Sequence, residues 1–547
     1  MSHPDDTTVH LDIDADVLVV GGGPAGTWAA VKAAEAGARV VLVDKGYCGS
    51  SGATAAAGTG VWYVPPVAGE RESAKASRES LGGHLADRRW MDRVLDETWA
   101  RVPELEEHGY PFPVDDETGL PIRTSLQGPD YMKRQRQRVA RAGVRILDHS
   151  PVLELLVDDD GAVVGAHGLR RQAAERYRVR AGATVLASGG CAFLSRTLGC
   201  NVDTGDGYLY AAEAGAELSG MEFSNSYSIA PAGTSVTKSA FYHWATFYRA
   251  DGTVLEGAGS QRGRSVIART LLDEPVFCRI DRLDDDLKQL LPTLQPNFFQ
   301  PFVKLGVDPF TDLFPVTLIL EGTVRGTGGL RIVDDSCATS VPGLFAAGDA
   351  ATRQEICGAF TGGGSHNAAW AISSGVWAGT GAADHALALK ATARTRPARG
   401  AGTVGLRPTG RPGPVDEHRD VVATVQGEVM PYDKNLFRTD PGLRASLTVL
   451  DDAWDRARSS LLGVGKDAYR AREAAAMVAT ARWMYRSGLV RTETRGMHKR
   501  DDFPQLDPEQ HHRILSGGLD EVWTAIEPLG WTVPPPTAAP ALAGAAR

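Results

Sequence analysis

The sequence predicts an α/β protein: a Rossmann-like dinucleotide-binding domain with an inserted α+β cap domain and a C-terminal helical domain. Three observations lead to this fold class. A wholly apolar run at 16–20 leads directly into a glycine-rich turn and a helical pattern. A second strand–glycine–helix pattern returns at 343–378, after a long stretch of different character. Residues 417–490 place apolar side chains at helical spacing.

Residues 16–45 form the first strand–turn–helix–strand unit. The run 16–20 fits a buried parallel strand, because such strands are apolar on both faces. Residues 27–36 predict an alanine-rich helix that Gly37 ends, and 39–44 predict the second strand.

The segments that follow differ in character. Residues 70–145 are mainly helical in pattern, and 144–179 predict a β-meander with a hairpin turn at 158–161. Another buried strand ends in glycines at 184–190. Residues 220–322 then gain aromatic residues and prolines, which indicates an inserted domain.

The glycine motif after the first strand predicts a dinucleotide cofactor. Gly21 permits a tight turn, Gly23 lets the backbone approach a pyrophosphate, and Gly26 lets the helix pack closely on the strand. The helix N-terminus offers unpaired N–H groups and a partial positive charge. Asp44, at the end of the second strand, can accept hydrogen bonds from ribose hydroxyls. A glycine turn of purely structural use is the alternative.

The second βα unit favours FAD over NAD. Gly348-Asp349 ends an apolar strand, and its carboxylate can bond a ribitol hydroxyl, which NAD lacks. Residues 362–366 open a helix whose N-terminus can face the N1/C2-carbonyl edge of a flavin. The predicted FAD contacts are Gly21, Gly23, Pro24, Ala25, Gly26, Asp44, Lys45, Ser50, Ser51, Gly52, Asp206, Gly348, Asp349, Gly364 and Ser365.

Together these motifs resemble the fumarate reductase/succinate dehydrogenase flavoprotein family, which includes L-aspartate oxidase and the adenylylsulfate reductase flavoprotein. The resemblance runs from residue 16 to about 505. Its landmarks are 21–26, 204–207, 341–349, 493–498 and 500–504.

The predicted domain divisions follow from the motifs and from this resemblance. They are a first part of the FAD-binding domain (1–220), an inserted cap or substrate domain (221–322), a second part of the FAD-binding domain (323–388), a linker (389–416), a C-terminal helical domain (417–532) and a disordered tail (533–547).

The resemblance also bears on how the flavin is attached. Family members that bind FAD covalently carry a histidine just after the second strand. Here that segment, 49–58, has none, and no histidine lies between His10 and His84. We therefore expect non-covalent FAD, with NADPH or NADH left open as a co-substrate. Ser50 and Ser51 are expected to contact phosphate or flavin, or else only to form a turn.

The predicted catalytic cation is Arg264. The family carries a catalytic arginine in an R-D-x-x-x-R segment, and Arg264 to Arg269 has the same spacing. Ser265 replaces the acid, which argues against a proton relay through that position. Arginine suits carboxylates because its planar fork is bidentate and permanently charged. A surface helix arginine is the alternative.

At three positions where family members carry a polar residue of the site, this sequence has a different residue. These positions are Tyr227, Val324 and one near Thr361. Other groups would then have to complete an anion site. The predicted catalytic residues are Arg264, Tyr227, His366 and Arg325, and the predicted substrate-binding residues are Arg264, Arg353, Arg438 and His243. A packing role for His366 and a structural role for Arg438 are the alternatives.

Composition limits the partners. The net charge is -9, from 58 basic and 67 acidic residues, which argues against nucleic acid or an anionic membrane and leaves a small anionic substrate. There is no run of 18 apolar residues and no signal peptide, so no membrane span and a cytoplasmic location are expected. The six cysteines lack metal spacing, so no metal is expected. A homo-oligomer is left open.

The expected function is that of an FAD-dependent oxidoreductase, a dehydrogenase, reductase or oxidase. Its substrate would be a small carboxylate or amino-acid-like molecule held between flavin and cap. One alternative is a flavin-dependent N-monooxygenase that uses NAD(P)H and O2, for example in L-aspartate N-hydroxylation toward nitrosuccinate. The other is an electron-transfer flavoprotein subunit of a larger complex.

Overall fold

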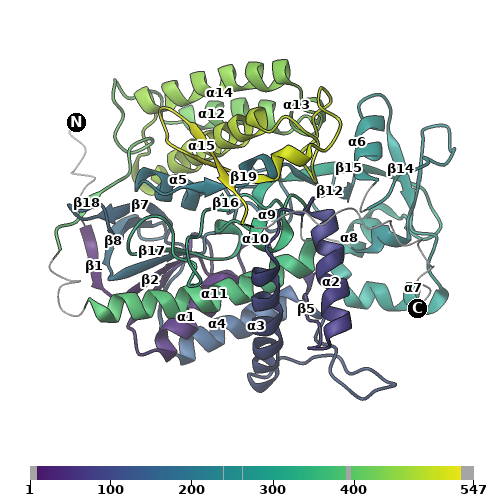
Figure 1. Cartoon of the computed structure of the whole chain (residues 1–547), viewed down its shortest axis with the longest axis horizontal. Coiled ribbons are helices and arrows are strands. Elements are labelled where there is room, and N and C mark those ends of the chain that lie inside the picture. The colour runs from purple at the N-terminus through teal and green to yellow at the C-terminus, as the bar shows by residue number, and fades with distance from the viewer. Residues whose placement is uncertain (1–8, 238–239, 261–262, 362, 390–395, 531–547) are drawn as a thin grey trace.

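The computed structural model describes residues 9–237, 240–260, 263–361, 363–389 and 396–530 (Figure 1). The predicted tail, 533–547, lies outside the described residues. The α/β fold class is confirmed by a parallel sheet flanked by helices, an antiparallel cap sheet and a group of C-terminal helices.

A five-stranded parallel sheet, in the order β17-β10-β2-β3-β6, forms the centre of the fold. Its strands are β2 (Val17–Val20), β3 (Val40–Val43), β6 (Arg145–Leu147), β10 (Ala183–Leu186) and β17 (Leu344–Ala346). β2 and β3 are buried along their whole length, which is why they are apolar at every position. The second βα unit enters this sheet through β17, which pairs with β10.

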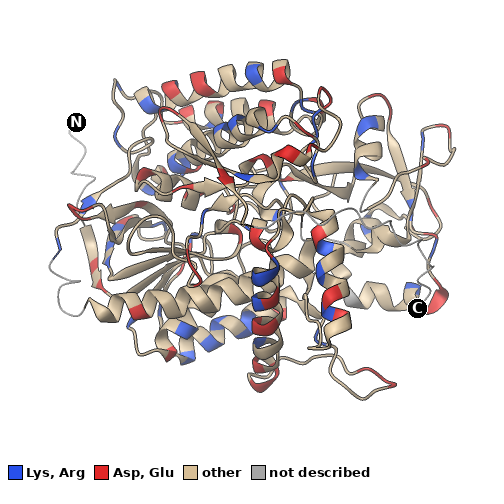
Figure 2. Cartoon of the chain, viewed as in Figure 1, with Lys and Arg blue, Asp and Glu red and all other residues tan. Residues whose placement is uncertain are grey.

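Helices α1 (Pro24–Glu35) and α11 (Gly363–Ala388) pack against each other beside this sheet (Figure 1). Their backbones approach closely, since a Cβ at Gly379 would lie 2.3 Å from the carbonyl oxygen of Ala29. A polar outer layer consists of α2 (Ala68–Leu81), α3 (Arg88–Glu107), α4 (Gly128–Arg141) and the small ladder β4 (Gly58–Gly60) with β5 (Ser125–Gln127). Figure 2 shows acidic and basic residues interspersed along α2 and α3.

The predicted meander forms a second sheet, in the order β1-β9-β8-β7-β18. Its strands are β1 (Val9–Asp14), β7 (Val152–Val157), β8 (Val163–Arg170), β9 (Glu175–Arg180) and β18 (Arg399–Gly400). The β7–β8 turn is closed by Asp158, whose carboxylate accepts hydrogen bonds from the N–H groups of Asp160 and Ala162. Sequence patterning missed β18, a two-residue strand inside the predicted linker that pairs with β7.

A buried carboxylate, Glu154, holds the β18 segment in place. It accepts hydrogen bonds from Gly402 N at 3.0 Å and from Arg407 at 2.7 and 2.9 Å, and it lies 3.4 Å from His167. Burial disfavours its ionised form, but His167 and Arg407 outweigh burial and lower the pKa of Glu154 to about 2. The ionised form is therefore the one that the fold stabilises.

Replacing Glu154 by glutamine is expected to make stability less dependent on pH. Because the unfolded carboxyl binds its proton more tightly, its contribution, roughly 3 kcal/mol, is full above about pH 5 and is lost as the pH falls toward 2. Denaturant unfolding at pH 7 should show that the variant is less stable than the wild type. Near pH 3 the difference in the free energy of unfolding between the two should be much smaller. The control is Glu175→Gln, which removes the exposed ion pair with Arg170 and should change stability by under about 1 kcal/mol. An equal loss at both pH values would contradict the expectation.

The predicted cap residues form a four-stranded antiparallel sheet, in the order β12-β15-β14-β13. Its elements are β12 (Ser226–Pro231), β13 (Thr246–Tyr248), β14 (Val276–Arg279), β15 (Phe314–Glu321), α6 (Arg264–Thr270), α7 (Asp285–Leu294) and α8 (Pro296–Leu305). Aromatic rings fill its interior: Phe298 contacts Phe241, Tyr242, Phe299 and Phe302 edge-on or tilted, with centroids 5.1 to 5.9 Å apart. The short helix α9 (Gly322–Arg325) follows the last cap strand, and the short helix α10 (Gln354–Cys357) lies between β17 and α11.

The C-terminal region is helical, but it also supplies two strands. Helices α12 (Glu417–Val429), α13 (Tyr432–Asn435), α14 (Asp440–Ser460) and α15 (Ala468–Val490) lie together at the top of Figure 1. The predicted helical domain, 417–532, ends in a hairpin of β19 (His512–Gly517) and β20 (Trp523–Pro528). β19 pairs with β11 (Leu218–Ser219), which also pairs with β16 (Gly329–Leu330), so the β19–β20 hairpin is built into the FAD-binding half.

A buried ion-pair network joins these two halves. Arg491 contacts both Glu222 and Glu493 at 2.9 Å, and Arg495 lies 2.6 Å from Glu493. The Arg491, Glu222 and Glu493 side chains are fully buried. Arg495 also donates to the carbonyl of Gly83. Among the described residues, no helix is both long and apolar enough to cross a membrane.

Candidate active site

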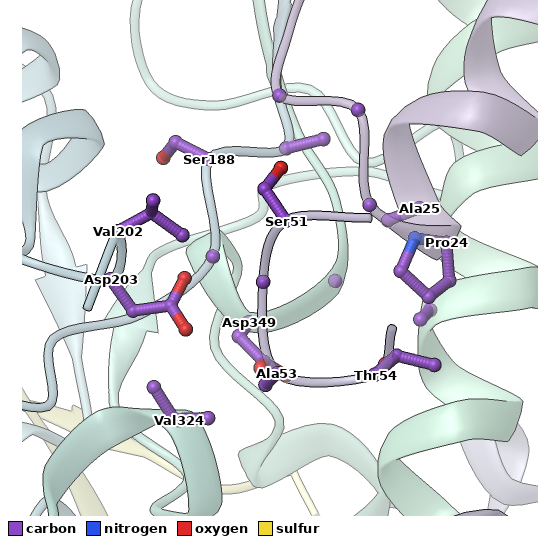
Figure 3. Close-up of a pocket in the computed structure, with 18 of the residues that line it drawn as sticks. Pro24, Ala25, Ser51, Ala53, Thr54, Ser188, Val202, Asp203, Val324 and Asp349 are labelled. Carbon is purple, nitrogen blue, oxygen red and sulfur yellow. The ribbon is translucent and has the colours of Figure 1, made fainter. Parts of the chain in front are cut away.

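The carboxyl ends of the parallel strands open onto a cavity of roughly 1240 Å³, part of which is open to solvent. In Figure 3, Ser51, Asp203 and Asp349 come from three separate segments and surround one space. The lining residues are 20–25, 43–45, 51–54, 57–59, 150–152, 187–189, 202–203, 206, 210, 324–325, 347–349, 364, 367–368 and 371. This end of the sheet is where open α/β folds bind their ligands.

The three motif glycines play three different physical roles. Gly21 has φ +109°, and a Cβ there would lie 2.2 Å from the carbonyl oxygen of Ala187. A Cβ at Gly26 would lie 1.8 Å from the carbonyl oxygen of Gly21, so strand and helix touch. Gly23 lines the cavity, and its Cβ position meets nothing within 4 Å. Helix α1 begins there without a side-chain cap, so its first N–H groups suit a pyrophosphate.

Gly23→Ala is expected to fold and to weaken FAD binding by a factor of about 10 to 100, because the methyl group enters the space that a phosphate would occupy. Its φ of -74° suits any residue. Flavin fluorescence after ultrafiltration measures the dissociation constant. Gly69→Ala on α2 is the matched control, since its Cβ also meets nothing within 4 Å but lies outside the cavity. Unchanged FAD affinity in the Gly23 variant would be the contrary result.

Asp44 and Lys45 form the next part of the cavity wall. Asp44 accepts hydrogen bonds from Gly22 N at 2.6 Å, Gly46 N at 2.7 Å and Ser51 Oγ at 2.9 Å. Lys45 donates to Thr204 at 2.7 Å and contacts Asp206 at 2.6 Å and Glu473 at 2.9 Å. Burial opposes the charge of Lys45, but Asp206 and Glu473 outweigh it and raise the pKa of the ammonium group.

The far end of the cavity is formed by Asp349 and the first turns of α11. Arg353 bonds the Asp349 carboxylate, and Tyr208 donates to the carbonyl of Asp349 at 2.6 Å. Gly364, Asn367 and Ala368 of α11 also line the cavity. The N-terminus of this helix therefore faces the space where we expect the flavin ring.

Two polar atoms of the cavity wall are buried without partners. Within the described part of the chain, Ser188 Oγ and Asn367 Oδ1 have no hydrogen-bond partner. Buried polar atoms of this kind are usually paired, so they indicate a ligand. The residues fit FAD: Gly23 to Ala25 for the pyrophosphate, Asp44 for the ribose, Asp349 for the ribitol and α11 for the isoalloxazine. When bound, FAD would supply two-electron redox chemistry.

One arginine lines this cavity, and a second is near enough for the two charges to interact. Arg325 of α9 lines the cavity. Arg264 of α6 is not among the lining residues and donates to Ser260 O at 2.5 Å and Tyr227 O at 3.2 Å. Burial and the nearby charge of Arg325 lower the pKa of Arg264 to about 10, so the Arg264 guanidinium stays charged near neutral pH. Among the described residues, Nη2 of Arg264 and both terminal nitrogens of Arg325 have no hydrogen-bond partner, and they stay accessible.

The other predicted catalytic and substrate groups are engaged elsewhere. Tyr227 donates its hydroxyl to the carbonyls of Val429 and Met430, away from the cavity. His243 is exposed, 2.9 Å from Ser260 Oγ. His366 lies against Trp62, with ring centroids 4.4 Å apart.

Arg353 and Arg438 are fully buried, and their contacts are structural. Arg353 binds Asp349 and the carbonyls of Thr323, Val324 and Gly326. It therefore holds Asp349 in place. Arg438 donates to Asn435 and to the carbonyl of Glu222, and it contacts His498 Nδ1 at 2.9 Å.

Of the predicted FAD contacts, twelve line the cavity, and Gly26, Ser50 and Ser365 do not. Gly26 acts through packing, Ser50 lies at an exposed turn, and Ser365 Oγ is 3.2 Å from His366 Nδ1. Sequence reasoning missed Ser188 and Asn367, although each is next to a glycine signal that it used. It also missed Glu321, which lies 3.4 Å from Arg325 Nε and for which no local pattern exists.

A glycine-rich strand–helix turn, a second βα half-site and a cap cavity lined by arginine together define an FAD-dependent oxidoreductase. The described residues contain no group of three or more His, Cys, Asp or Glu side chains able to hold a metal ion. Comparison with known proteins agrees with this class. The FAD binding domain family matches residues 16–231, and the fumarate reductase flavoprotein C-terminal family matches residues 426–524.

Relatives cover nearly the whole chain. A fumarate reductase (CoM/CoB) chain of Methanothermobacter marburgensis is 27% identical, over 92% of this chain and 97% of that relative. L-aspartate oxidase of Streptomyces coelicolor is 27% identical, over 90% of each. Quinol fumarate reductase of E. coli matches in fold with a TM-score of 0.80 at 21% identity, over 96% of this chain and 99% of that one. The chain is therefore similar to fumarate reductase and L-aspartate oxidase flavoproteins over nearly its whole length, and it carries segments that match both families.

Proposed function

We propose that this chain uses non-covalent FAD to oxidise or reduce a small carboxylate or amino-acid-like substrate, held between the flavin and the cap. The pair Arg264–Arg325 carries the proposal. Arg325 presents unused N–H donors at the cavity, and Arg264 adds a second positive charge that interacts with it; such a pair suits a carboxylate. The names of the relatives, fumarate reductase and L-aspartate oxidase, are consistent with a substrate of this class.

The residues of this chain would bind and orient the substrate. Arg325 and Arg264 would hold its carboxylate, and the cap sheet above them would exclude water. Asp349, held by Arg353, and the N-terminus of α11 would position the flavin beneath the substrate. A helix N-terminus also favours the negative charge that a reduced flavin carries.

Non-covalent attachment is supported by the cavity wall, which contains no histidine among the described residues. Acid precipitation of the purified yellow protein is expected to release all of the flavin into the supernatant, where its absorbance can be measured. A chromophore that stays in the pellet would contradict non-covalent binding.

The reaction is tested by mixing the oxidised protein anaerobically with a panel of small carboxylates and amino acids while the flavin absorbance at about 450 nm is followed. Bleaching by one of them, without NAD(P)H, supports an oxidation of that substrate. Reoxidation of the reduced protein by an unsaturated dicarboxylate supports a reduction. Turnover that requires NAD(P)H and O2 and yields an N-oxygenated product would support the N-monooxygenase alternative. Turnover only with an added iron–sulfur partner would support the electron-transfer alternative.

A further inference from the structure

A buried carboxylate lies directly behind the anion site. Glu321 ends β15, immediately before the short helix α9 that carries Arg325. Its side chain is fully buried, and it accepts hydrogen bonds from Ser228 Oγ and, at 2.7 Å, from Thr237 Oγ1. Two hydroxyl donors from separate segments therefore hold this carboxylate in one position.

Glu321 contacts Arg325 on one edge of the guanidinium. Its Oε2 lies 3.4 Å from Nε of Arg325, four residues later in the chain. The side chain of Arg325 is 18% exposed, whereas that of Glu321 is 0% exposed. The inner edge of the guanidinium thus faces the carboxylate, while the two terminal nitrogens stay accessible at the cavity.

The charge of Glu321 also offsets a repulsion. Burial and the charge of Arg325 lower the pKa of Arg264, and the Glu321 carboxylate offsets part of that lowering. Without this carboxylate the Arg325 side chain would be free to turn toward solvent, away from the like charge of Arg264.

We infer that Glu321 is a positioning residue of the anion site: it holds Arg325 by Nε so that both terminal nitrogens face the substrate carboxylate. This inference rests on the proposed function. Glu321 would not touch the substrate itself, since its oxygens are buried behind Arg325 and occupied by Ser228 and Thr237.

A binding titration with a mutant cycle tests the inference. The FAD-loaded protein is titrated with succinate, L-aspartate and malonate, and the shift of the flavin visible spectrum gives a dissociation constant for each. Arg325→Met is expected to weaken binding by about 50-fold, and Glu321→Gln by about tenfold. The double variant should bind no more weakly than Arg325→Met, because the glutamate acts through the arginine.

Matched variants separate positioning from general damage. Glu428 is also buried, accepts from Ser446 Oγ at 2.6 Å and pairs with Lys434 at 2.8 Å, yet it lies outside the cavity. Glu428→Gln should leave all three dissociation constants unchanged. Thr237→Val, which removes one donor to Glu321, should shift binding in the same direction by a smaller factor. It replaces Glu321→Gln if that variant fails to fold.

The outcomes distinguish two failures. If Arg325→Met weakens binding but the Glu321 and Thr237 variants bind as wild type, the positioning role is overturned and the anion site stands. Equal effects of Glu321→Gln in the presence and absence of Arg325 would also overturn it. If wild type responds to none of the three anions, or Arg325→Met changes nothing, the proposed anion site fails and this inference fails with it.

Discussion

Arg264→Met is expected to lower kcat/KM by about 100- to 1000-fold while the protein keeps its FAD. One preorganised cationic donor contributes a rate factor of this size in a cavity that excludes water. Methionine replaces the unbranched aliphatic part of the side chain but has no charge with which to bind an anion. The flavin contacts lie on other segments, so the visible spectrum should remain that of a loaded flavoprotein.

The measurement is steady-state kinetics with the substrate that bleaches the flavin, together with the FAD content of each variant. Arg264→Lys should recover part of the loss, because it restores the charge without the bidentate fork. Arg249→Met is the matched control, because this exposed cap arginine already pairs with Glu274. If the Arg264 variant shows wild-type kinetics, Arg264 has no role in the reaction.

Arg491→Met is expected to destabilise the protein by about 3 to 5 kcal/mol. The change leaves Glu222 and Glu493 buried, and Glu222 without its ion-pair partner. Breaking a buried pair is costly because the remaining charge keeps its desolvation penalty. Burial already raises the pKa of Glu222 despite the nearby Arg491, so its carboxyl would take up a proton more readily in the variant.

Thermal denaturation followed by flavin fluorescence measures the loss of stability. Arg491→Lys should be destabilised less, since it keeps the charge but not the four contacts that the guanidinium makes. Arg444→Met serves as the control, because Arg444 pairs with Asp440 on the exposed face of α14. Equal melting temperatures for the Arg491 and Arg444 variants would contradict a role for the network in stability.

The sequence predicted those parts of the fold whose causes are local. The glycines of the first βα turn, the apolar strands and the helical spacing after 417 each reflect the geometry of their own segment. β18 and the β19–β20 hairpin escaped prediction because their pairing depends on distant partners, Glu154 for the first and β11 for the second.

The site residues divide in the same way, into those that local sequence places and those that distant contacts place. Gly23, Asp44 and Asp349 line the cavity because the backbone motif alone directs them there. Arginines are harder to place, since one long side chain can reach several partners. The segments around Arg353 and Arg264 both predicted a site residue. In the structure Arg353 donates to backbone carbonyls, whereas Arg264 keeps one N–H donor accessible. The role of Glu321 depends on three segments meeting, which no spacing rule reveals.

Because β17 is synthesised long after β10, the nascent chain contains β10 before its partner strand exists. When residue 231 leaves the ribosome, β10 already borders β2, but its other edge must wait for residue 344. An open apolar strand edge readily recruits other chains. A fragment ending at 231 should therefore self-associate on expression, even though it contains the whole glycine turn.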